Sequence, residues 1–551
     1  MTATAEAPVA AATGEEPAST LAGTAALVRF GLRRDRVKLP AWVAGVGVFT
    51  LYLVAAIPAA YSMEEGDLAG AAQLFGDPVG RMLTGPAYGL DAPTYERFVA
   101  GGYGLYFLLL VALMSLLLVT RHTRAEEQSG RAELVRAGLV GRHAPLTAAL
   151  VLAVLTNALA GVLVAVVMLG VGGYAPAGTV LFAAAVAATG LAFAGVTAVT
   201  VQLSASSRAA GGLAGVVIGA AFVVRAGGDM TGEGGSALSW ASPLAWGQQT
   251  APFVLDRWWP LALTLGFTAA TTAAGYALSS RRDLGASLLA VRAGRARGGA
   301  SLGTPLGLAL RLQRPLILGW GAAIVVMGLV YGLFTDALLA ATEDMPEAFL
   351  ELFGGAEEML AGYQAYMAVF MAYLTGGYAV MAVQGLRAEE TRGRAEAVLA
   401  TGVSRVRWLA AHLAVITGAV AVIMAASGAA TGLGTVLVVA EGGYTSELTL
   451  AHLAHVPAVL VVGALAVLLY GVAPRAVPAA WALVGYGLVV GTFGPLLDLP
   501  QAAFDASPYE HVAAMPQEAF AAGPVAALLA LAAALAALGA LALRRRDLEG
   551  R

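Results

Sequence analysis

Long apolar stretches without a charged side chain constrain this chain more than any other feature. Residues 144–207 contain no Asp, Glu, Lys or Arg, and neither do residues 476–497. About 20 apolar residues are enough for a helix to cross the hydrocarbon core of a bilayer. Only 12% of the 551 residues are charged, whereas a soluble domain usually has about 25%. The sequence therefore predicts an all-α polytopic membrane protein.

Twelve stretches are long and apolar enough to be predicted as transmembrane helices. Their approximate bounds are 40–61, 102–120, 145–170, 178–203, 207–224, 258–279, 316–335, 366–386, 408–438, 452–473, 477–497 and 521–543. The connections between them alternate between Arg-rich and acidic segments, as the positive-inside rule requires. We expect the protein to lie in a bacterial plasma membrane. Its Arg-rich connections and both termini should face the cytoplasm.

An internal repeat divides the chain. Residues 124–142 (RAEEQSGRAELVRAGLVGR) return as 387–405 (RAEETRGRAEAVLATGVSR), with twelve identities in nineteen positions at an offset of 263. Three shorter echoes are LRRDR and LRLQR before Trp42 and Trp320, LFG at 74–76 and 352–354, and RRDLG and RRDLE at 281–285 and 545–549. Equal numbers of spans predict parallel six-span repeats about an axis along the membrane normal.

This repeat sets the expected division of the chain. The parts are a disordered N-terminal tail (1–19), a first six-span half (20–289), a cytoplasmic linker (290–305) and a second six-span half (306–551). The tail is expected to be disordered because it is rich in Ala, Glu, Pro and Thr without an apolar period.

The repeated segment carries paired acids at helical spacing. Counted as one helix, a stripe of four residues occurs identically twice, as Glu126, Gly130, Glu133 and Ala137, and as Glu389, Gly393, Glu396 and Ala400. The pairs Glu127–Arg131 and Glu390–Arg394 have i,i+4 spacing, which is worth about 0.2–0.5 kcal/mol per pair. Because glycine inside a helix costs about 0.5–1 kcal/mol relative to alanine, its repetition suggests that a partner approaches closely. We therefore predict a docking helix; the alternative is a charged connection that only enforces orientation.

The second copy, EETRGRAEAVLATGVSR, resembles the E-x-x-G-x-x-E…TPVSR signature of the cytoplasmic coupling helix in type-2 ABC export permeases. The whole of 20–551 is similar to fused twelve-span permeases described as exporters of polyketide antibiotics (tetronasin type). The segments ALVRFGLRRDRVKLPAW and LSWASPLAWGQQTAPFVLDRWWPL carry that wider resemblance. In the first copy the end has drifted, and in the second Gly402 replaces the usual Pro, so the two docking sites need not be equivalent.

This resemblance implies that separate ABC ATP-binding subunits, two copies, dock on the two coupling helices and drive export with Mg-ATP. The residues themselves point the same way, since Lys38 is the single lysine and does not lie in a GxxxxGK[ST] motif. The chain is thus expected to be a transport subunit and not an enzyme, with no cofactor or metal of its own. The expected partners besides the ATPase are the lipid bilayer and hydrophobic small-molecule cargo, with no nucleic acid.

Two further regions are predicted to serve the exporter. Residues 21–38 form an amphipathic elbow helix along the membrane surface, with a weaker copy before the seventh span; its charged positions are Arg29, Arg33, Arg36, Arg311 and Arg314. Residues 239–259 are rich in Trp and Pro and form either an interfacial aromatic belt or an outer gate. A gate would pair Ser242, Pro243 and Trp246 with Ser507, Pro508 and His511.

Cargo and driving force are constrained by what the spans contain. Spans without internal charge favour a hydrophobic or amphipathic cargo over a small ion. Polar or aromatic side chains that could line its path are Tyr103, Tyr106, Asn157, Gln202, Tyr366, Tyr373 and Gln384. The alternative is a proton-coupled drug antiporter, which needs a titratable group within the membrane; His412, His452 and His455 are the candidates. A membrane-embedded transferase is a third reading, but the outer acids have no His or basic partner nearby in the sequence.

Overall fold

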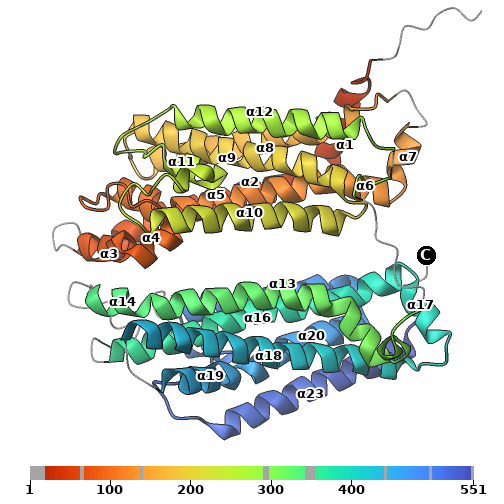
Figure 1. The fold of residues 1–551 in the computed structure, drawn as a ribbon. Coiled ribbons are helices and arrows are strands. Elements are labelled where there is room, and N and C mark those ends of the chain that lie inside the picture. The colour runs from red at the N-terminus through yellow and green to blue at the C-terminus, as the bar shows by residue number, and fades with distance from the viewer. Residues whose placement is uncertain are drawn as a thin grey trace, which may run out of the picture. The chain divides into compact units, whose positions relative to one another are not determined.

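The computed structural model describes residues 19–61, 67–136, 140–283, 285–289, 297–341, 355, 358–439, 443–494 and 499–547. These residues form helices and turns and no strand, which confirms the all-α prediction. The chain divides into two compact units, Met1–Ala293 and Gly294–Arg551 (Figure 1). The predicted tail lies outside the described residues except for Ser19, and the predicted linker is described only from residue 297 onward.

The first unit begins with a short surface helix and continues with long apolar helices. Its elements are α1 (Thr24–Arg34), α2 (Lys38–Ala60), α3 (Asp67–Gly76), α4 (Pro78–Thr84), α5 (Tyr95–His122), α6 (Arg124–Gln128), α7 (Arg131–Arg136), α8 (Ala144–Gly170), α9 (Pro176–Leu203), α10 (Ser207–Asp229), the 3-10 helix η1 (Ser239–Ala241), α11 (Pro243–Gln248) and α12 (Pro260–Ser279).

The second unit contains the two longest individual helices of the described part, α16 with 33 residues and α18 with 35. Its elements are η2 (Ala300–Gly303), α13 (Pro305–Leu333), α14 (Thr335–Ala341), α16 (Met359–Thr391), α17 (Arg394–Leu399), α18 (Arg405–Val439), α19 (Tyr444–Ala454), α20 (Val456–Val472), η5 (Pro474–Ala480), α21 (Trp481–Phe493), α22 (Gln501–Asp505) and α23 (Ala522–Arg545).

Eleven helices of the described part are long and apolar enough to cross a membrane. The eleventh expected span, 477–497, is not one continuous α-helix, because η5 precedes the 13-residue α21. Pro474 and Pro478 lack the N–H groups that an α-helix needs there, and the chain winds as a 3-10 helix instead. At rises of about 2.0 and 1.5 Å per residue, η5 and α21 together span about 33 Å, enough for a hydrocarbon core of about 30 Å.

The second and fourth predicted spans form the core of each unit. In the first unit α9 packs against α5, α8 and α12, and in the second α20 packs against α16 and α23. By contrast, α8 and α12 expose large apolar side chains such as Val162, Val166 and Leu265. Aliphatic side chains directed away from the protein are expected where lipid is the solvent.

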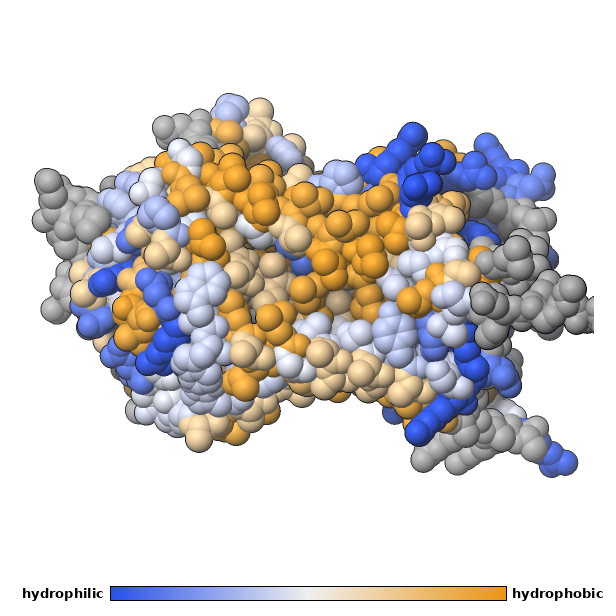
Figure 2. Space-filling view, turned by 90° about the horizontal axis from the view of Figure 1, so that it is seen from above, coloured by the Kyte–Doolittle hydropathy of each residue, from blue (hydrophilic) through white to orange (hydrophobic). Residues whose placement is uncertain are grey.

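The short helices gather at the two ends of each bundle. In the first unit α1, α6 and α7 lie at one end and α3, α4 and α11 at the other (Figure 1). In the second unit α17 and the C-terminus lie at the end opposite α14. Figure 2 shows a broad hydrophobic band between hydrophilic ends. The Arg-rich repeated segments are thus placed beyond the apolar part of the bundles.

Candidate functional site

Each repeated Glu-Glu segment consists of the end of one helix and a short second helix, joined at a glycine. The first piece ends at Gln128, Gly130 has a φ of +73°, and α7 begins at Arg131. In the second copy α16 ends at Thr391, Gly393 has a φ of +71°, and α17 begins at Arg394. The prediction of one continuous helix through the glycine is therefore wrong at both sites.

The backbone conformation explains why glycine is repeated. A φ near +70° is left-handed, and glycine is the residue that adopts it at little cost. A Cβ built on either glycine would meet no atom of the chain within 4 Å, so the surroundings within the chain do not demand it. The single stripe predicted for these residues is consequently broken. Ala137 lies outside the described residues, and Ala400 caps the end of α17.

The break also changes which acid meets which arginine. Arg131 donates from Nε to Glu126 at 3.0 Å, and Arg394 donates from Nε to Glu389 at 2.6 Å. The predicted pairs Glu127–Arg131 and Glu390–Arg394 are wrong, because the left-handed turn directs each arginine back to the earlier glutamate. Glu133 and Glu396 are exposed one turn further along, on α7 and α17.

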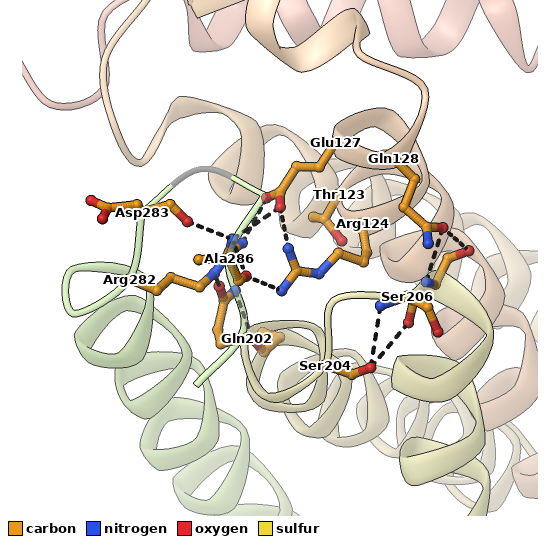
Figure 3. A network of polar contacts seen from close by, with 12 residues as sticks. Thr123, Arg124, Glu127, Gln128, Gln202, Ser204, Ser206, Arg282, Asp283 and Ala286 are labelled. Atoms are coloured by element: carbon orange, nitrogen blue, oxygen red, sulfur yellow. Dashed lines mark hydrogen bonds and ion pairs between the residues drawn. The ribbon is translucent and has the colours of Figure 1, made fainter. Parts of the chain in front are cut away.

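The second glutamate of the first segment faces the protein interior. Arg282 donates to both oxygens of Glu127, at 2.6 and 2.9 Å, and buried Arg124 also contacts this carboxylate (Figure 3). The Nε of Arg282 donates to Gln202 Oε1 at 2.5 Å, near the end of α9. The Glu127–Arg282 pair thus ties the segment to the ends of the fourth and sixth spans.

The second unit repeats this arrangement. Arg546 donates to both oxygens of Glu390, at 2.6 and 2.7 Å, and Glu390 is only 1% exposed. Tyr470, near the end of α20, donates to the same carboxylate at 2.6 Å, and the Arg546 guanidinium lies 5.1 Å from its ring centre. Arg282 and Arg546 occupy the same place in the RRDLG and RRDLE echoes. Sequence reasoning found those echoes but gave them no role, although they were the signal for these pairs.

The elbow helix differs between the two units. In the first, α1 is separate from α2, with Asp35 buried between them. Arg121 donates to Asp35 from two nitrogens, at 2.7 and 2.8 Å, and His122 Nε2 lies 2.9 Å from it. Burial alone would raise the pKa of the Asp35 carboxyl, but the hydrogen bonds and charges of Arg121 and His122 outweigh it and lower the pKa.

In the second unit the elbow and the seventh span are one helix, α13, which bends near its N-terminal end (Figure 1). Pro315 inside the helix is the expected cause of such a bend. The predicted elbow arginines are all exposed, namely Arg29, Arg33, Arg36, Arg311 and Arg314. Sequence reasoning missed Arg34, which contacts Glu126 and joins the elbow to the first Glu-Glu segment.

The two predicted outer-gate segments do not have the same structure. Ser242 caps α11 and donates to Ala221 O at 2.6 Å, and Trp246 Nε1 donates to Trp240 O at 2.7 Å. Ser507 and Pro508 are buried in a turn, and exposed His511 lies 2.9 Å from Asp505 O. Each Ser-Pro is followed by a fully buried side chain, Leu244 or Tyr509. Trp258 and Trp259 are half exposed, as an aromatic belt requires.

The predicted cargo-path residues separate into two groups. Asn157 is buried and donates to Ser115 Oγ at 2.9 Å, Tyr373 packs on Tyr509, and Gln202 belongs to the Glu127–Arg282 network. These three are buried within their own units, and that they line the cargo path stays a prediction. Tyr106 is exposed, and Tyr103, Tyr366 and Gln384 are partly exposed.

One buried ion pair in a span was not predicted. Arg225 donates to Asp229 Oδ2 at 2.9 Å within α10, and neither side chain is exposed. Sequence reasoning ended this span at residue 224, where the apolar run stops, whereas the helix continues to Asp229. Ser239 donates to the same carboxylate at 2.6 Å, so this network ties the C-terminal end of α10 to η1.

Three histidines of the second unit, His412, His452 and His455, are buried, and among the described residues they form no metal-binding cluster with acids or other ligands. His412 Nδ1 lies 3.2 Å from Gln313 Nε2, and His452 Nδ1 lies 2.8 Å from Leu448 O. Across the part of the chain that the structure describes, no group of three or more His, Cys, Asp or Glu residues could hold a metal ion.

The eleven long apolar helices of the described residues, a two-unit repeat and paired charged segments beyond the apolar bundles define a polytopic membrane protein. The comparisons with known proteins make that class specific. The chain is 38% identical over 538 residues to the multidrug efflux system permease protein Rv1217c of Mycobacterium tuberculosis (strain ATCC 25618 / H37Rv), covering 96% of both chains. Residues 302–544 match the family described as the C-terminal domain of multidrug efflux system permease Rv1217c. The chain therefore belongs to this family of multidrug efflux permeases.

Proposed function

We propose that this permease is the membrane-spanning subunit of an ATP-driven ABC exporter, powered by separate ATP-binding subunits. The observation that carries the proposal is that one structural arrangement of the Glu-Glu segment occurs in both units. Each unit has a left-handed glycine that turns a short helix outward, with an exposed acid at Glu133 or Glu396. Each has an inner acid bound to the end of its last span. The absence of a P-loop from the sequence supports ATP hydrolysis in a partner chain.

Two similar docking segments imply two copies of the ATP-binding subunit, each with Mg-ATP. Positive-inside topology then places the Arg-rich ends and both termini in the cytoplasm of a bacterial cell. The two segments differ in their surroundings, because Glu126 contacts elbow Arg34 as well as Arg131, whereas Glu389 contacts Arg394. The two subunits are thus expected to bind unequally.

The proposed cargo is hydrophobic or amphipathic and includes antibiotics. Exposed aliphatic residues and the sparse charge of the spans favour entry from the lipid phase over passage of a small ion. The resemblance of the whole chain to tetronasin-type exporters supports polyketide antibiotics as one class of cargo. The name of the mycobacterial relative supports a wider range of drugs.

The proposed coupling step is mechanical. When two ATP-binding subunits close on ATP, each displaces the Glu-Glu segment that it holds. The Glu127–Arg282 and Glu390–Arg546 pairs pass this displacement to the ends of the fourth and sixth spans of their own unit. If bound ATP changes the equilibrium affinity for cargo by a given factor, bound cargo must change the affinity for ATP by the same factor.

The test is a pull-down of tagged permease from its native membrane with mass spectrometry of retained proteins. The double variant Glu133→Arg with Glu396→Arg should lose the ATP-binding subunit and efflux together. Glu447→Arg, an exposed acid at the start of α19 on the predicted outer side, is the matched control and should lose neither. Retention of the ATPase and efflux by the double variant would contradict the docking assignment. Export by a preparation that holds no P-loop protein would favour the proton-coupled antiporter.

A further inference from the structure

An open cavity lies beside the first Glu-Glu segment. It opens to solvent and is lined by α1, the segment around Glu126, the start of α8 and residues 279–283. The cavity lies wholly within the first unit, so its existence does not depend on how the units are placed.

The cavity wall has a charged part and an apolar part. Arg34, Arg131, Arg142 and Arg282 contribute four positive charges, against three negative charges from Glu126, Glu127 and Asp283. Leu27 and Phe30 of the elbow and Leu146 and Leu152 of α8 contribute apolar surface. A pocket of this kind matches a molecule with a polar head and an apolar body.

The second unit shows what fills the equivalent space. At the repeat offset of 263, Pro145 and Ala149 correspond to Trp408 and His412. Both of these larger side chains are buried, their ring centres are 4.9 Å apart, and His412 also contacts Gln313. Pro145 and Ala149 both line the cavity of the first unit. The cavity is thus the consequence of two smaller residues on α8.

The elbow residue that contributes a charge to the cavity wall in the first unit is uncharged in the second. In the elbow echo, LRRDR against LRLQR, Arg34 corresponds to Leu312. Arg34 contacts Glu126 through Nη1, its one described ion pair. An arginine has five N–H donors, so Arg34 keeps donors for a second acceptor. The unit with the cavity is therefore also the unit with the additional cation.

We propose that this cavity binds an anionic amphiphile, with its acid group at Arg34 and its apolar body along Phe30, Leu146 and Leu152. Basic pockets at the cytoplasmic ends of membrane helices are suited to anionic lipid head groups. Two sources have this chemistry, an anionic phospholipid of the inner leaflet and a free amphiphilic acid. A molecule bound here contacts both the elbow and the Glu126 segment, and its binding does not require the proposed ATP-binding subunit.

The test is binding of 11-(dansylamino)undecanoic acid to the purified permease in a neutral detergent, followed by fluorescence. The double variant Pro145→Trp with Ala149→His copies the second unit and should abolish saturable binding. Arg34→Leu, also copied from the second unit, should weaken binding about tenfold or more, as expected for loss of a charge-assisted hydrogen bond. Arg311→Leu removes an exposed elbow arginine outside the cavity and should leave binding within about twofold of the original, since exposed charges contribute little.

The unaltered permease supplies a measurement that does not depend on the folding of variants. Oleate should displace the probe, whereas oleylamine, its cationic counterpart, should not. Displacement by phosphatidylglycerol as well assigns the site to membrane lipid, and displacement by oleate alone assigns it to a free amphiphilic acid. Equal displacement by oleylamine, or unchanged binding by the monodisperse cavity-filling variant, would overturn the proposal.

Discussion

The two units keep the same internal attachment of the Glu-Glu segment and differ at its periphery. In both, the inner glutamate binds an arginine that follows the last span, and a left-handed glycine turns the next helix outward. The first unit adds elbow contacts through Arg34 and Asp35, whereas the second has a continuous α13 and packs Trp408 and His412 instead. The comparison indicates that attachment to the last span is the common requirement, and that the elbow contacts are specific to each unit.

The largest effect is expected where the repeated ion pair is most buried. Arg546→Gln removes the two-bond partner of Glu390, which is 1% exposed. Leaving a buried charge without its partner costs about 3–5 kcal/mol. Arg282→Gln should cost less, because Glu127 keeps the positively charged Arg124 as a partner, whereas Glu390 keeps the neutral hydrogen bond of Tyr470. The melting temperature of purified permease, followed by tryptophan fluorescence, should fall further for Arg546→Gln than for Arg282→Gln.

Neighbouring arginines provide the controls for this ranking. Arg281 and Arg545 precede the two paired arginines in the chain and are exposed. Arg281→Gln and Arg545→Gln should leave the melting temperature nearly unchanged. The reverse ranking, or equal effects of paired and exposed arginines, would refute the shared attachment.

The next effect concerns the elbow of the first unit. Asp35→Asn removes the charge that Arg121 and His122 bind, and hydrogen bonds to a charged group contribute about 1.5–3 kcal/mol. The pKa of Asp35 is lower in the folded protein than in the unfolded chain. The charged carboxylate therefore stabilises the fold fully at pH values above the unfolded pKa, and this stabilisation is lost as the pH falls through the folded pKa. The difference in melting temperature between original and variant should be constant from about pH 6 to 8 and shrink only in acid below about pH 4.

Gln313→Ala is the matched change in the second unit, at the position corresponding to Asp35. It removes a neutral contact to His412 and should cost less than Asp35→Asn. Two results would contradict this assignment of the elbow contacts. One is a larger fall in melting temperature for Gln313→Ala than for Asp35→Asn, and the other is a loss of the Asp35→Asn effect near neutral pH.

The smallest effect is expected at the two glycines. Gly130→Ala and Gly393→Ala place a Cβ on a left-handed backbone, at about 1–2 kcal/mol each. The cost should be similar in both units because no neighbouring atom contributes to it. Gly385→Ala, inside α16 with open space around it, is the control and should be neutral or stabilising. Melting temperatures of the three variants check this, and equal effects at Gly385 and Gly393 would contradict the conformational explanation.

Sequence reasoning predicted the spans well and the site only in part. Uncharged runs determine where helices cross a membrane, because the bilayer leaves few alternatives for a backbone. Helical spacing counted through Gly130 gave the wrong partner for Glu127. The count assumes a continuous helix, and the left-handed backbone of Gly130 interrupts that helix. The true partner, Arg282, is 155 residues away, so local spacing carries no information about it. The repeated RRDL motif did carry that information.

Other differences have the same origin. The end of an apolar run is not the end of a helix, which is why Arg225 and Asp229 were assigned outside the fifth span. The cavity of the first unit depends on side-chain volume at Pro145 and Ala149, and its other walls come from segments distant in the chain. Once the repeat is aligned, however, Trp408 and His412 mark the difference in the sequence itself.

The most direct test of the central claim uses the absence of cysteine from the chain. Single variants Glu133→Cys and Glu396→Cys place one thiol on each Glu-Glu segment, and Glu447→Cys places one at the start of α19. Each is labelled with a maleimide photo-crosslinker in native membranes, and the captured proteins are identified by mass spectrometry. The account predicts that both segment positions capture an ATP-binding subunit with a P-loop and that position 447 does not. Capture from position 447 alone, or capture of no P-loop protein from positions 133 and 396 in membranes that export cargo, would contradict it.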